Sequence, residues 1–441
     1  MSGKSQEKAI REKAILVGAQ LRKAERAQTG LWEFSLEESL EELAVLAESA
    51  GAQVVGRLVQ VRDQADKATL VGAGKIGEIR ATATAAEASI VLFDGELTPT
   101  QQRNLEHELG TKVLDRTQLI LDVFAARART REGQLQVELA QLNYMLPRLA
   151  GRGSMMSRLG GGIGTRGPGE TQLETDRRKI GRRISLIKQN LEKVRSGRAI
   201  QRKQRQNVPL LTVALVGYTN AGKSSLFNRL TQAEVLADAK MFATLDPTVR
   251  HLVLPSRRKI LFSDTVGFIR RLPTTLVSAF RATLEEVVEA GLLLHVVDAS
   301  SPHAAAYIEH VQSVLAEIGA QHTQQILVLN KCDLLPPDED RLIALRRILK
   351  DPDGKAAHAV SVSARTGEGI DRLLELIDQV LPADPVERIR LELAAEDGAT
   401  LHLLHEYGRV LRQEFRDAVC ELEVDAPLSL RRQLKSFELI S

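Results

Sequence analysis

Apolar and polar positions follow helical and strand periods in turn over the first quarter of the chain. The stretch SLEESLEELAVLAESAG (residues 35–51) has the helical period, and a strand near Val54–Val61 follows it. A helical stretch around Gly77–Glu87, the strand Ser89–Phe93 and a helix ending at Leu109 continue the pattern. Strands that alternate with helices are typical of a parallel sheet, so we predict a small α/β unit.

Two long helices are predicted next, each with an apolar seam at spacings of 4, 3, 4 and 3. The seam of the first consists of Leu135, Leu139, Leu142, Leu146 and Leu149. The seam of the second consists of Ile180, Ile184, Ile187, Leu191 and Val194. Each is too short for a free coiled coil, so the two indicate an antiparallel hairpin within the chain. The segment Gly151–Gly169 is too rich in glycine for a helix, and we expect a mobile loop at the hairpin tip.

A second alternating pattern runs from Val208 to Leu381, with the apolar strands LLTVALVG, ILFSDT, LLLHVVD, QQILVLN and AVSVSA. Pro382, Asp384 and Pro385 mark a linker, and the remaining residues read as strand, helix, strand. The expected fold class is therefore α/β in four parts. These are an N-terminal α/β unit (1–116), a helical hairpin (117–206), a second α/β domain (207–382) and a small C-terminal α/β domain (383–441).

Composition narrows the class of protein. A chain of 441 residues is too long for one ordinary core, and 43% hydrophobic with 27% charged residues is typical of soluble globular proteins. Two cysteines, Cys332 and Cys420, give neither a disulfide framework nor a metal cluster. The first fourteen residues are mixed in charge and helical in character, with no apolar signal core, and no apolar run reaches the roughly 20 residues of a membrane span. We expect a cytoplasmic monomer.

The net charge of +3 is unevenly distributed. Between Arg152 and Arg205 there are fifteen basic residues and only four acidic ones. A concentrated basic segment on an otherwise acidic chain indicates a polyanionic partner, and a Gly/Arg-rich tip suits insertion among nucleic-acid phosphates. The alternative is a solvated face of the helical pair, which is the usual explanation of a charge run.

A phosphate-binding loop is predicted at Gly217-Tyr218-Thr219-Asn220-Ala221-Gly222-Lys223-Ser224, which fits GxxxxGK[ST]. It follows an apolar strand and precedes the helical stretch SLFNRLTQ, the context that this motif requires. Its glycines let backbone N–H groups converge on phosphate at a helix N-terminus. Lys223 would act as a catalytic charge on the β- and γ-phosphates, and the Ser224 hydroxyl as a ligand of Mg²⁺.

The segment Asp264-Thr265-Val266-Gly267 fits the DxxG pattern and ends the strand ILFS. Asp264 can hold Mg²⁺ through a water, and the Gly267 N–H can sense the γ-phosphate. A switch threonine that binds Mg²⁺ is expected within Phe242-Ala243-Thr244-Leu245-Asp246-Pro247-Thr248, where Thr244 and Thr248 fit the spacing equally. The residue after Gly267 is Phe268, where many GTPases have a water-orienting glutamine, so we expect slow intrinsic hydrolysis.

Guanine specificity is predicted by Asn330-Lys331-Cys332-Asp333, which ends the strand QQILVLN. The Asp333 carboxylate can accept hydrogen bonds from both N1–H and the amino group of guanine, a donor pair that adenine lacks. Ser363-Ala364-Arg365 ends the next strand, where its backbone can contact guanine O6. The four motifs in this order indicate a Mg²⁺-dependent GTPase, whose nucleotide site includes every residue of these motifs and of the segment Phe242–Asp246.

A rival function is suggested by Gly72-Ala73-Gly74-Lys75-Ile76-Gly77, a GxGxxG pattern with Asp94 after a later strand. These features fit a dinucleotide-dependent oxidoreductase. The preceding strand would be only Ala68–Val71, and no catalytic set follows. We favour glycines that serve a tight turn in the N-terminal unit.

The block GGGIGTRGPGETQLETDRR (residues 160–178) resembles the signature of the HflX family, and FATLDPT, DTVGF, NKCD and SAR agree with it in type and order. The resemblance covers nearly the whole chain from about residue 30. It implies a GTPase that binds the large ribosomal subunit and its rRNA and acts in ribosome dissociation, rescue or assembly. It also implies that Thr244 is the switch threonine. We expect catalytic roles for Lys223, Thr244 and Gly267. A switch for a non-ribosomal partner remains the alternative.

Overall fold

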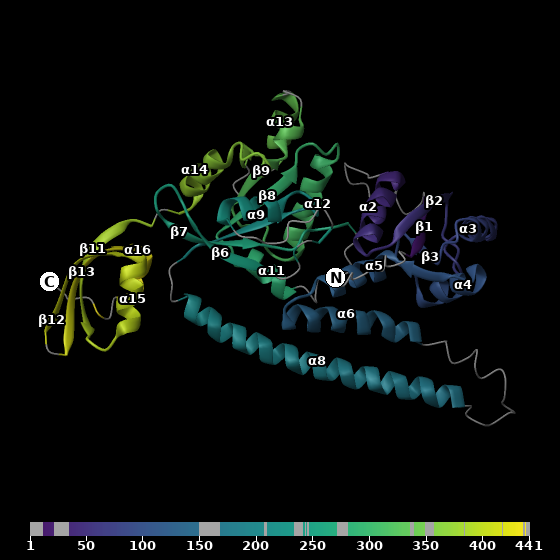
Figure 1. The fold of residues 1–441 in the computed structure, drawn as a ribbon, viewed down its shortest axis with the longest axis horizontal. Coiled ribbons are helices and arrows are strands. Elements are labelled where there is room, and N and C mark those ends of the chain that lie inside the picture. The colour runs from purple at the N-terminus through teal and green to yellow at the C-terminus, as the bar shows by residue number, and fades with distance from the viewer. Residues whose placement is uncertain are drawn as a thin grey trace, which may run out of the picture.

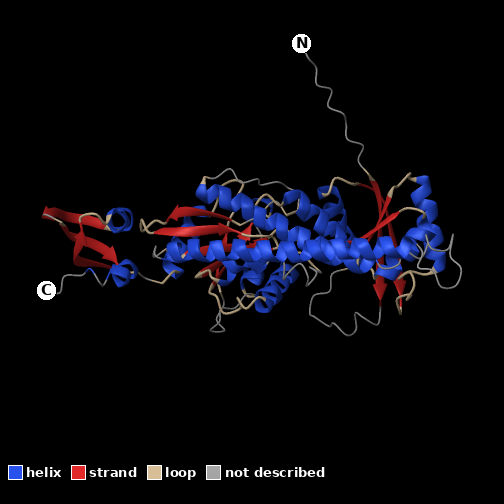
Figure 2. Ribbon diagram, turned by 90° about the horizontal axis from the view of Figure 1, so that it is seen from below, coloured by secondary structure: helices blue, strands red, loops and turns tan. Residues whose placement is uncertain are grey.

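The computed structural model describes residues 12–21, 35–149, 168–206, 210–232, 241–242, 244, 247–270, 281–335, 339–348, 357–382, 384–416, 418–434 and 437. They form an N-terminal α/β unit, a helical hairpin, a central α/β unit and a C-terminal α/β unit, arranged along one long axis (Figure 1). The hairpin runs beneath the N-terminal and central units (Figure 1), and its long helix crosses in front of them when the molecule is seen from below (Figure 2). No helix of the described part is long and apolar enough to cross a membrane.

The N-terminal unit is a four-stranded parallel sheet in the order β2-β1-β3-β4 with helices on both faces. Its elements are β1 (Lys13–Leu21), α2 (Leu36–Ser49), β2 (Gln53–Arg62), α3 (Ala73–Ala85), β3 (Ile90–Phe93), α4 (Pro99–Leu109), β4 (Lys112–Asp115) and α5 (Arg116–Arg127). Local signals set the helix ends. Ser35 and Glu38 form a capping box on α2, and Thr98 and Gln101 form one on α4. The predicted parallel sheet is confirmed.

Two expectations for this unit were wrong. Residues 1–14 were expected to be helical. Of these the structure describes residues 12–14, and Lys13 and Ala14 begin strand β1 in the interior of the sheet. Residues 68–71 form no strand, and α3 begins at Ala73, so Gly74 and Gly77 lie inside a helix and not in a tight turn. A Cβ at either glycine would meet nothing within 4 Å, so Gly77 does not serve the close helix–strand packing that requires the third glycine of a dinucleotide loop.

The predicted helical hairpin is confirmed as α6 (Arg131–Leu149) and α8 (Pro168–Gln206), which lie side by side (Figure 1). Leu135, Ile187 and Leu191 are buried between them, with Leu139 and Leu142 packed alongside. Pro168 and Gly169, expected in the tip loop, already belong to α8. The rest of that predicted loop lies outside the described residues.

The central unit is a six-stranded sheet in the order β10-β9-β8-β5-β7-β6, parallel except for β6. Its elements are β5 (Thr212–Gly217), α9 (Lys223–Thr231), β6 (Thr248–Val253), β7 (Lys259–Asp264), α11 (Arg281–Val288), β8 (Leu292–Asp298), α12 (Ala304–Glu317), β9 (Gln325–Asn330), a 3₁₀ turn (Cys332–Leu334), α13 (Glu339–Arg346), β10 (His358–Ser361) and α14 (Ile370–Val380). The four predicted nucleotide motifs end or follow the parallel strands β5, β7, β9 and β10, so they meet at the carboxyl edge of this sheet.

The C-terminal unit is richer than the predicted strand, helix, strand. It contains β11 (Val386–Ala394), α15 (Gly398–Tyr407), β12 (Arg409–Arg416), β13 (Val419–Pro427) and α16 (Leu428–Leu434). The antiparallel order is β11-β13-β12. Alternate residues of β13 point into a small core with Leu404 and Leu430. The alternation of apolar and charged residues in β11 was visible in the sequence. The antiparallel pairing of β12 with β13 was not predicted.

Candidate nucleotide-binding site

The loop between β5 and α9 has a backbone that requires glycine at two positions. Gly217 has a φ of 149° and Gly222 a φ of 92°. A Cβ on Gly217 would lie 2.2 Å from the carbonyl oxygen of Val296, and one on Gly222 would lie 2.2 Å from Nδ2 of Asn330. Both distances are far inside van der Waals contact. The two glycines of the predicted phosphate motif therefore let this loop pack against the ends of β8 and β9.

Lys223 is the first residue of α9, and its side chain is enclosed by the loop. It is 6% exposed, and its Nζ donates to the carbonyl oxygens of Gly217 at 3.0 Å and Tyr218 at 2.8 Å. Burial lowers the pKa of Lys223 to about 8, against a smaller opposing effect of Asp264. The ammonium group is thus held at the centre of the loop, where a phosphate would compensate its charge.

The three predicted metal ligands converge. Thr244 Oγ1 lies 2.9 Å from Ser224 Oγ and donates to Asp264 Oδ2 at 2.7 Å. The other carboxylate oxygen of Asp264 is buried without a hydrogen-bond partner, and burial raises the pKa of this carboxyl. Two hydroxyls and a desolvated carboxylate are hard oxygen donors that suit Mg²⁺. Thr248, the alternative switch threonine, begins β6 and pairs with Asp264 through the backbone register.

The predicted guanine motifs are joined to the phosphate loop by Asn330. Its Nδ2 donates to the carbonyl oxygen of Ala221 at 2.8 Å, and its Oδ1 accepts from the Ala364 N–H at 3.0 Å. Lys331 adopts a left-handed φ of 63° and pairs with Asp298 at 2.7 Å. Of the remaining residues, Ser363 is buried, Cys332 is half-buried, and Asp333 and Arg365 are exposed. The exposed carboxylate of Asp333 is accessible to a base.

The DxxG segment lies directly against the phosphate loop. The Phe268 N–H donates to the Gly217 carbonyl at 3.1 Å, and the Thr219 N–H donates to the Phe268 carbonyl at 2.8 Å. A Cβ on Gly267 would lie 2.9 Å from Lys223 Nζ. The Phe268 ring is 4% exposed in an apolar cluster beneath the sheet edge. It therefore cannot orient a water at the site.

Comparison with known proteins identifies the family. Three family models cover most of the chain: "GTP-binding GTPase N-terminal" at residues 37–125, "GTP-binding GTPase Middle Region" at 127–205 and "50S ribosome-binding GTPase" at 212–331. The GTPase HflX of Caldanaerobacter subterraneus is 46% identical over 91% of this chain and 90% of its own length. The chain belongs to the HflX family of GTPases. It binds GTP and hydrolyses it.

A second relative agrees with this family. The GTPase HflX of Escherichia coli is 43% identical over 90% of the chain and 92% of its own length. Among solved structures, a GTP-binding protein of Sulfolobus solfataricus in complex with GDP is 24% identical over 83% of this chain and 98% of its own, with a TM-score of 0.44.

Both predicted switch segments of this HflX-family chain dock on the N-terminal unit. Met241 and Phe242, which precede Thr244, belong to the same buried cluster as Phe124 of α5 and Leu40 of α2. Val266 and Ile269 of the DxxG region join that cluster as well. The Phe242 and Phe124 rings meet edge to face, with centroids 4.4 Å apart. The predicted switch residues are thus shared between two units, which no local sequence signal indicated.

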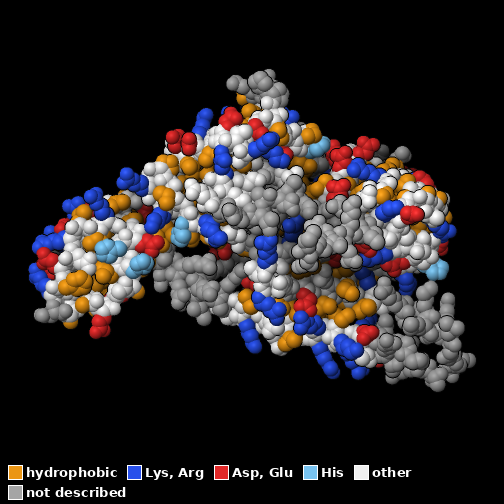
Figure 3. Space-filling model, in the orientation of Figure 1, with side chains coloured by type: hydrophobic (Ala, Val, Ile, Leu, Met, Phe, Trp, Pro, Cys, Tyr) orange, Lys and Arg blue, Asp and Glu red, His pale blue; other side chains and the backbone are white. Residues whose placement is uncertain are grey.

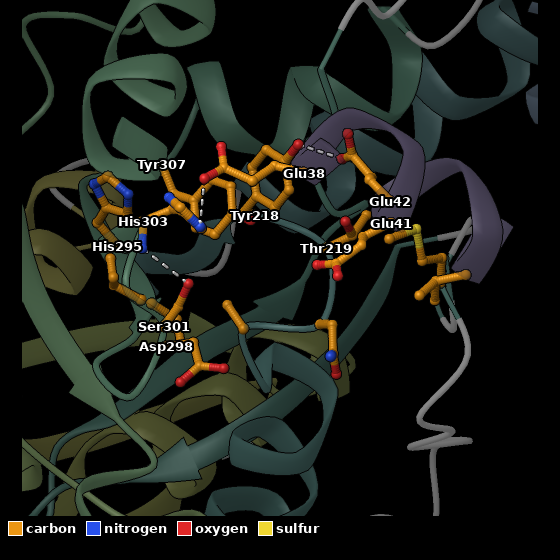
Figure 4. Close-up of a pocket in the computed structure, with 16 residues that line it drawn as sticks. Glu38, Glu41, Glu42, Tyr218, Thr219, His295, Asp298, Ser301, His303 and Tyr307 are labelled. Carbon is orange, nitrogen blue, oxygen red and sulfur yellow. Dashed lines mark hydrogen bonds and ion pairs between the residues drawn. The ribbon is translucent and has the colours of Figure 1, made fainter. Parts of the chain in front are cut away.

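A pocket of about 220 Å³ lies between α2 and the phosphate loop (Figure 4). Glutamates of α2 form one wall, and Tyr218 and Thr219 form the other, with Tyr307 of α12 beside them. His295 is fully buried below the loop, and burial lowers its pKa to about 3, so it is neutral there.

The structure therefore brings together the four predicted motifs, with the residues Gly217–Ser224, Phe242, Thr244, Asp264–Gly267, Asn330–Asp333 and Ser363–Arg365 around one edge of the sheet. Ala243, Leu245 and Asp246 lie outside the described residues. The individual roles of all of these residues remain predictions.

The pKa of Lys223 predicts how GTP affinity depends on pH. Above pH 8 the free protein holds Lys223 mostly neutral, whereas the bound phosphates favour the charged form. Binding must then take up a proton, so GTP affinity is expected to fall by up to about tenfold per pH unit above pH 8. Calorimetric titration at pH 7, 8 and 9, in buffers of different ionisation enthalpy, measures the GTP affinity and the number of protons taken up on binding. An affinity that is unchanged at pH 9, with no proton uptake, would contradict the prediction.

Proposed function

We propose that this GTPase binds the large ribosomal subunit, uses the hairpin as a basic arm on rRNA, and acts in ribosome dissociation, rescue or assembly. The observation that carries the proposal is the exposed positive charge along α8. Lys and Arg side chains follow the outer edge of the hairpin (Figure 3). The match of residues 212–331 to a family described as a 50S ribosome-binding GTPase supports the same partner.

The charge on α8 is only partly neutralised. Arg178 and Lys179 pair with acids of α8 itself, and Arg183 pairs with Glu138 of α6. Four more exposed basic residues form no ion pair within the described part of the chain, and these are Arg177, Arg182, Lys188 and Lys193. Such side chains release counterions when they meet phosphates, so the arm would give affinity that depends on salt more than on base sequence.

In the proposed reaction cycle, Ser224, Thr244 and Asp264 would hold Mg²⁺, which neutralises phosphate charge when bound. Lys223 would bind the β- and γ-phosphates, and the Gly267 N–H would contact the γ-phosphate. Asp333 would select guanine. The buried Phe268 ring supports slow hydrolysis in the free protein. It occupies the position at which many GTPases have a water-orienting glutamine, and it points into the core.

The switch would act through the N-terminal unit. In the simplest coupling, GTP would set the angle between the hairpin and the GTPase domain directly. The apolar contacts of Phe242 and Ile269 with the N-terminal core support a less direct route. Helix α6 packs on α5, the helix that supplies Phe124 to that core. A change in the switches would therefore reorient the N-terminal unit together with its arm.

Co-sedimentation with purified large ribosomal subunits tests the proposal. We expect more protein in the pellet with a non-hydrolysable GTP analogue than with GDP, and a steep decrease as salt rises. The triple variant Arg177→Ala/Arg182→Ala/Lys188→Ala is expected to bind more weakly. The slope of the logarithm of its affinity against the logarithm of salt concentration should decrease in magnitude by roughly one for each phosphate that the arm no longer neutralises.

A matched control removes the same charge elsewhere. Arg57, Arg103 and Arg372 are exposed and lie outside the arm. Their triple alanine variant should bind subunits as the unmodified chain does, and both triple variants should retain GTP affinity. Equal binding by the arm variant and its control would contradict the proposal. Nucleotide-independent capture of another protein would favour a non-ribosomal partner.

A further inference from the structure

A buried cluster of charged side chains joins the N-terminal unit to the GTP site. Glu42 of α2 is 8% exposed. It accepts hydrogen bonds from Arg116 of α5, from the Tyr218 hydroxyl in the phosphate loop, and from Nε of Arg270 at 3.0 Å. Arg116 also binds Asp94 at 2.7 Å. One carboxylate of the N-terminal unit therefore holds two elements of the nucleotide site (Figure 4 shows its bond to Tyr218).

Tyr218 and Arg270 are also bonded to each other. The Tyr218 hydroxyl accepts from the Arg270 backbone N–H at 3.1 Å, and the Tyr218 ring stacks on Tyr307 with centroids 4.1 Å apart. Burial and the neighbouring Glu42 charge raise the pKa of the Tyr218 hydroxyl, so it remains a donor to Glu42. Arg270 is thus fixed at both its backbone and its guanidinium, three residues after Gly267.

Arg270 is the residue of this cluster that can move away from Glu42. Arg116 spans both carboxylates, Glu42 and Asp94, and is 2% exposed in the N-terminal unit. If Arg270 moved, Glu42 would keep Arg116 and the Tyr218 hydroxyl as partners, so its charge would stay hydrogen-bonded. Arg116, in contrast, is enclosed by its own unit. Of the two arginines, Arg270 is the one on a segment that contacts the phosphate loop directly.

Hydrolysis of GTP needs positive charge near the γ-phosphate in the transition state, and an arginine is an effective source of it. The Phe268 ring is buried and contributes no polar group. Arg270 is the nearest basic residue after it in the sequence. While Arg270 is paired with Glu42, its charge is already satisfied by a carboxylate and is withheld from a phosphate.

We propose that Arg270 is a catalytic residue of GTP hydrolysis. Glu42 of the N-terminal unit binds its guanidinium and keeps it from the γ-phosphate until the two separate. Water attacks the γ-phosphorus and its proton passes to the phosphate oxygens. The bond from the γ-phosphorus to the bridging oxygen breaks, and GDP leaves with the electron pair. The guanidinium stabilises the charge on the transferring phosphoryl group and is itself unchanged. Withdrawal of α2 from the site releases Arg270.

Single-turnover GTP hydrolysis by the full chain, without ribosomes, tests this inference independently of any partner. The variants are Glu42→Gln, Arg270→Ala and their combination. Glu42→Gln is expected to raise the rate by at least about tenfold, because the neutral amide no longer retains the guanidinium. In the Glu42→Gln background, Arg270→Ala should remove the gain, and Arg270→Ala alone should produce no rise in rate.

The matched control is Glu38→Gln, on the same helix. Glu38 Oε1 lies 3.0 Å from Nε2 of His303 in the GTPase domain, so this variant also alters a polar contact between the two units without changing Arg270 or Glu42. Glutamine preserves its capping box with Ser35. The control should hydrolyse GTP at the basal rate, which separates release of Arg270 from general loosening of the interface.

Affinity for a fluorescent GTP analogue and a thermal melt accompany each variant. If Glu42→Gln melts below the assay temperature, Glu42→Asp replaces it, because it keeps a negative charge in the buried cluster while its side chain, shorter by one methylene, no longer reaches Arg270 in its present position. The inference is overturned if the rate does not rise in the folded Glu42 variant. It is equally overturned if the rise persists without Arg270, since the gain would then come from another group.

Discussion

Replacing Asp333 by asparagine is expected to weaken GTP binding by about 10⁴-fold and to favour xanthosine triphosphate instead. The carboxylate is predicted to accept from two donors of guanine, N1–H and the amino group. An asparagine amide would place its own donor against one of them, whereas xanthine has a carbonyl at the position of that amino group. Asp333 is exposed on the turn after β9, so the substitution leaves the core unchanged.

Fluorescence titration with GTP, xanthosine triphosphate and ATP measures the effect. The control is Glu375→Gln, which removes an exposed carboxylate from α14 of the same domain. It should bind GTP normally. The assignment of Asp333 would be wrong if the asparagine variant still preferred GTP to xanthosine triphosphate.

Replacing Gly267 by alanine is expected to lower GTP hydrolysis by roughly 10²-fold or more, the usual cost of displacing one transition-state hydrogen-bond donor. A Cβ at this position would lie 2.9 Å from Lys223 Nζ, 2.9 Å from Thr219 Cγ2 and 3.0 Å from Thr219 Cα. The Thr219 backbone cannot yield, so the DxxG segment must shift away from the phosphates. GDP affinity should change much less, because this segment is predicted to contact only the γ-phosphate.

Single-turnover hydrolysis and GDP titration measure the two effects. Gly291→Ala is the matched control, because its Cβ would meet atoms only at 3.6 and 3.8 Å, which is ordinary contact. It should hydrolyse GTP at the normal rate. Normal hydrolysis by the Gly267 variant would show that this backbone does not sense the γ-phosphate.

The nucleotide site was predictable because each of its motifs is local. The glycines of the phosphate loop, Lys223 and Ser224 occupy eight consecutive residues between a strand and a helix, so spacing alone indicates their geometry. The order of the motifs then places them at one edge of a parallel sheet. Spacing could not choose between Thr244 and Thr248, and the structure places Thr244 at the cluster with Ser224 and Asp264.

The N-terminal strand shows where sequence reasoning fails. The stretch around Lys13 reads as mixed and charged, yet β1 becomes the central strand because β2 and β3 pair with its two edges. The glycines at Gly74 and Gly77 look like a nucleotide loop, but the helix α3 contains them. In both cases packing against residues that are distant in the sequence outweighs the structure that the local residue pattern favours, as it often does for short elements.

The sequence by itself determined the family, the α/β class, the order of the nucleotide motifs and the basic hairpin. These depend on short-range spacing and periodicity, which the chain displays directly. Only the tertiary structure decided that both switches share a core with Phe124, and that Glu42 holds Tyr218 and Arg270. Those contacts join residues that lie more than a hundred positions apart in the chain. Their physical basis is burial of complementary apolar and charged groups between two folded units, and one chain read alone carries no periodic signal of such a match.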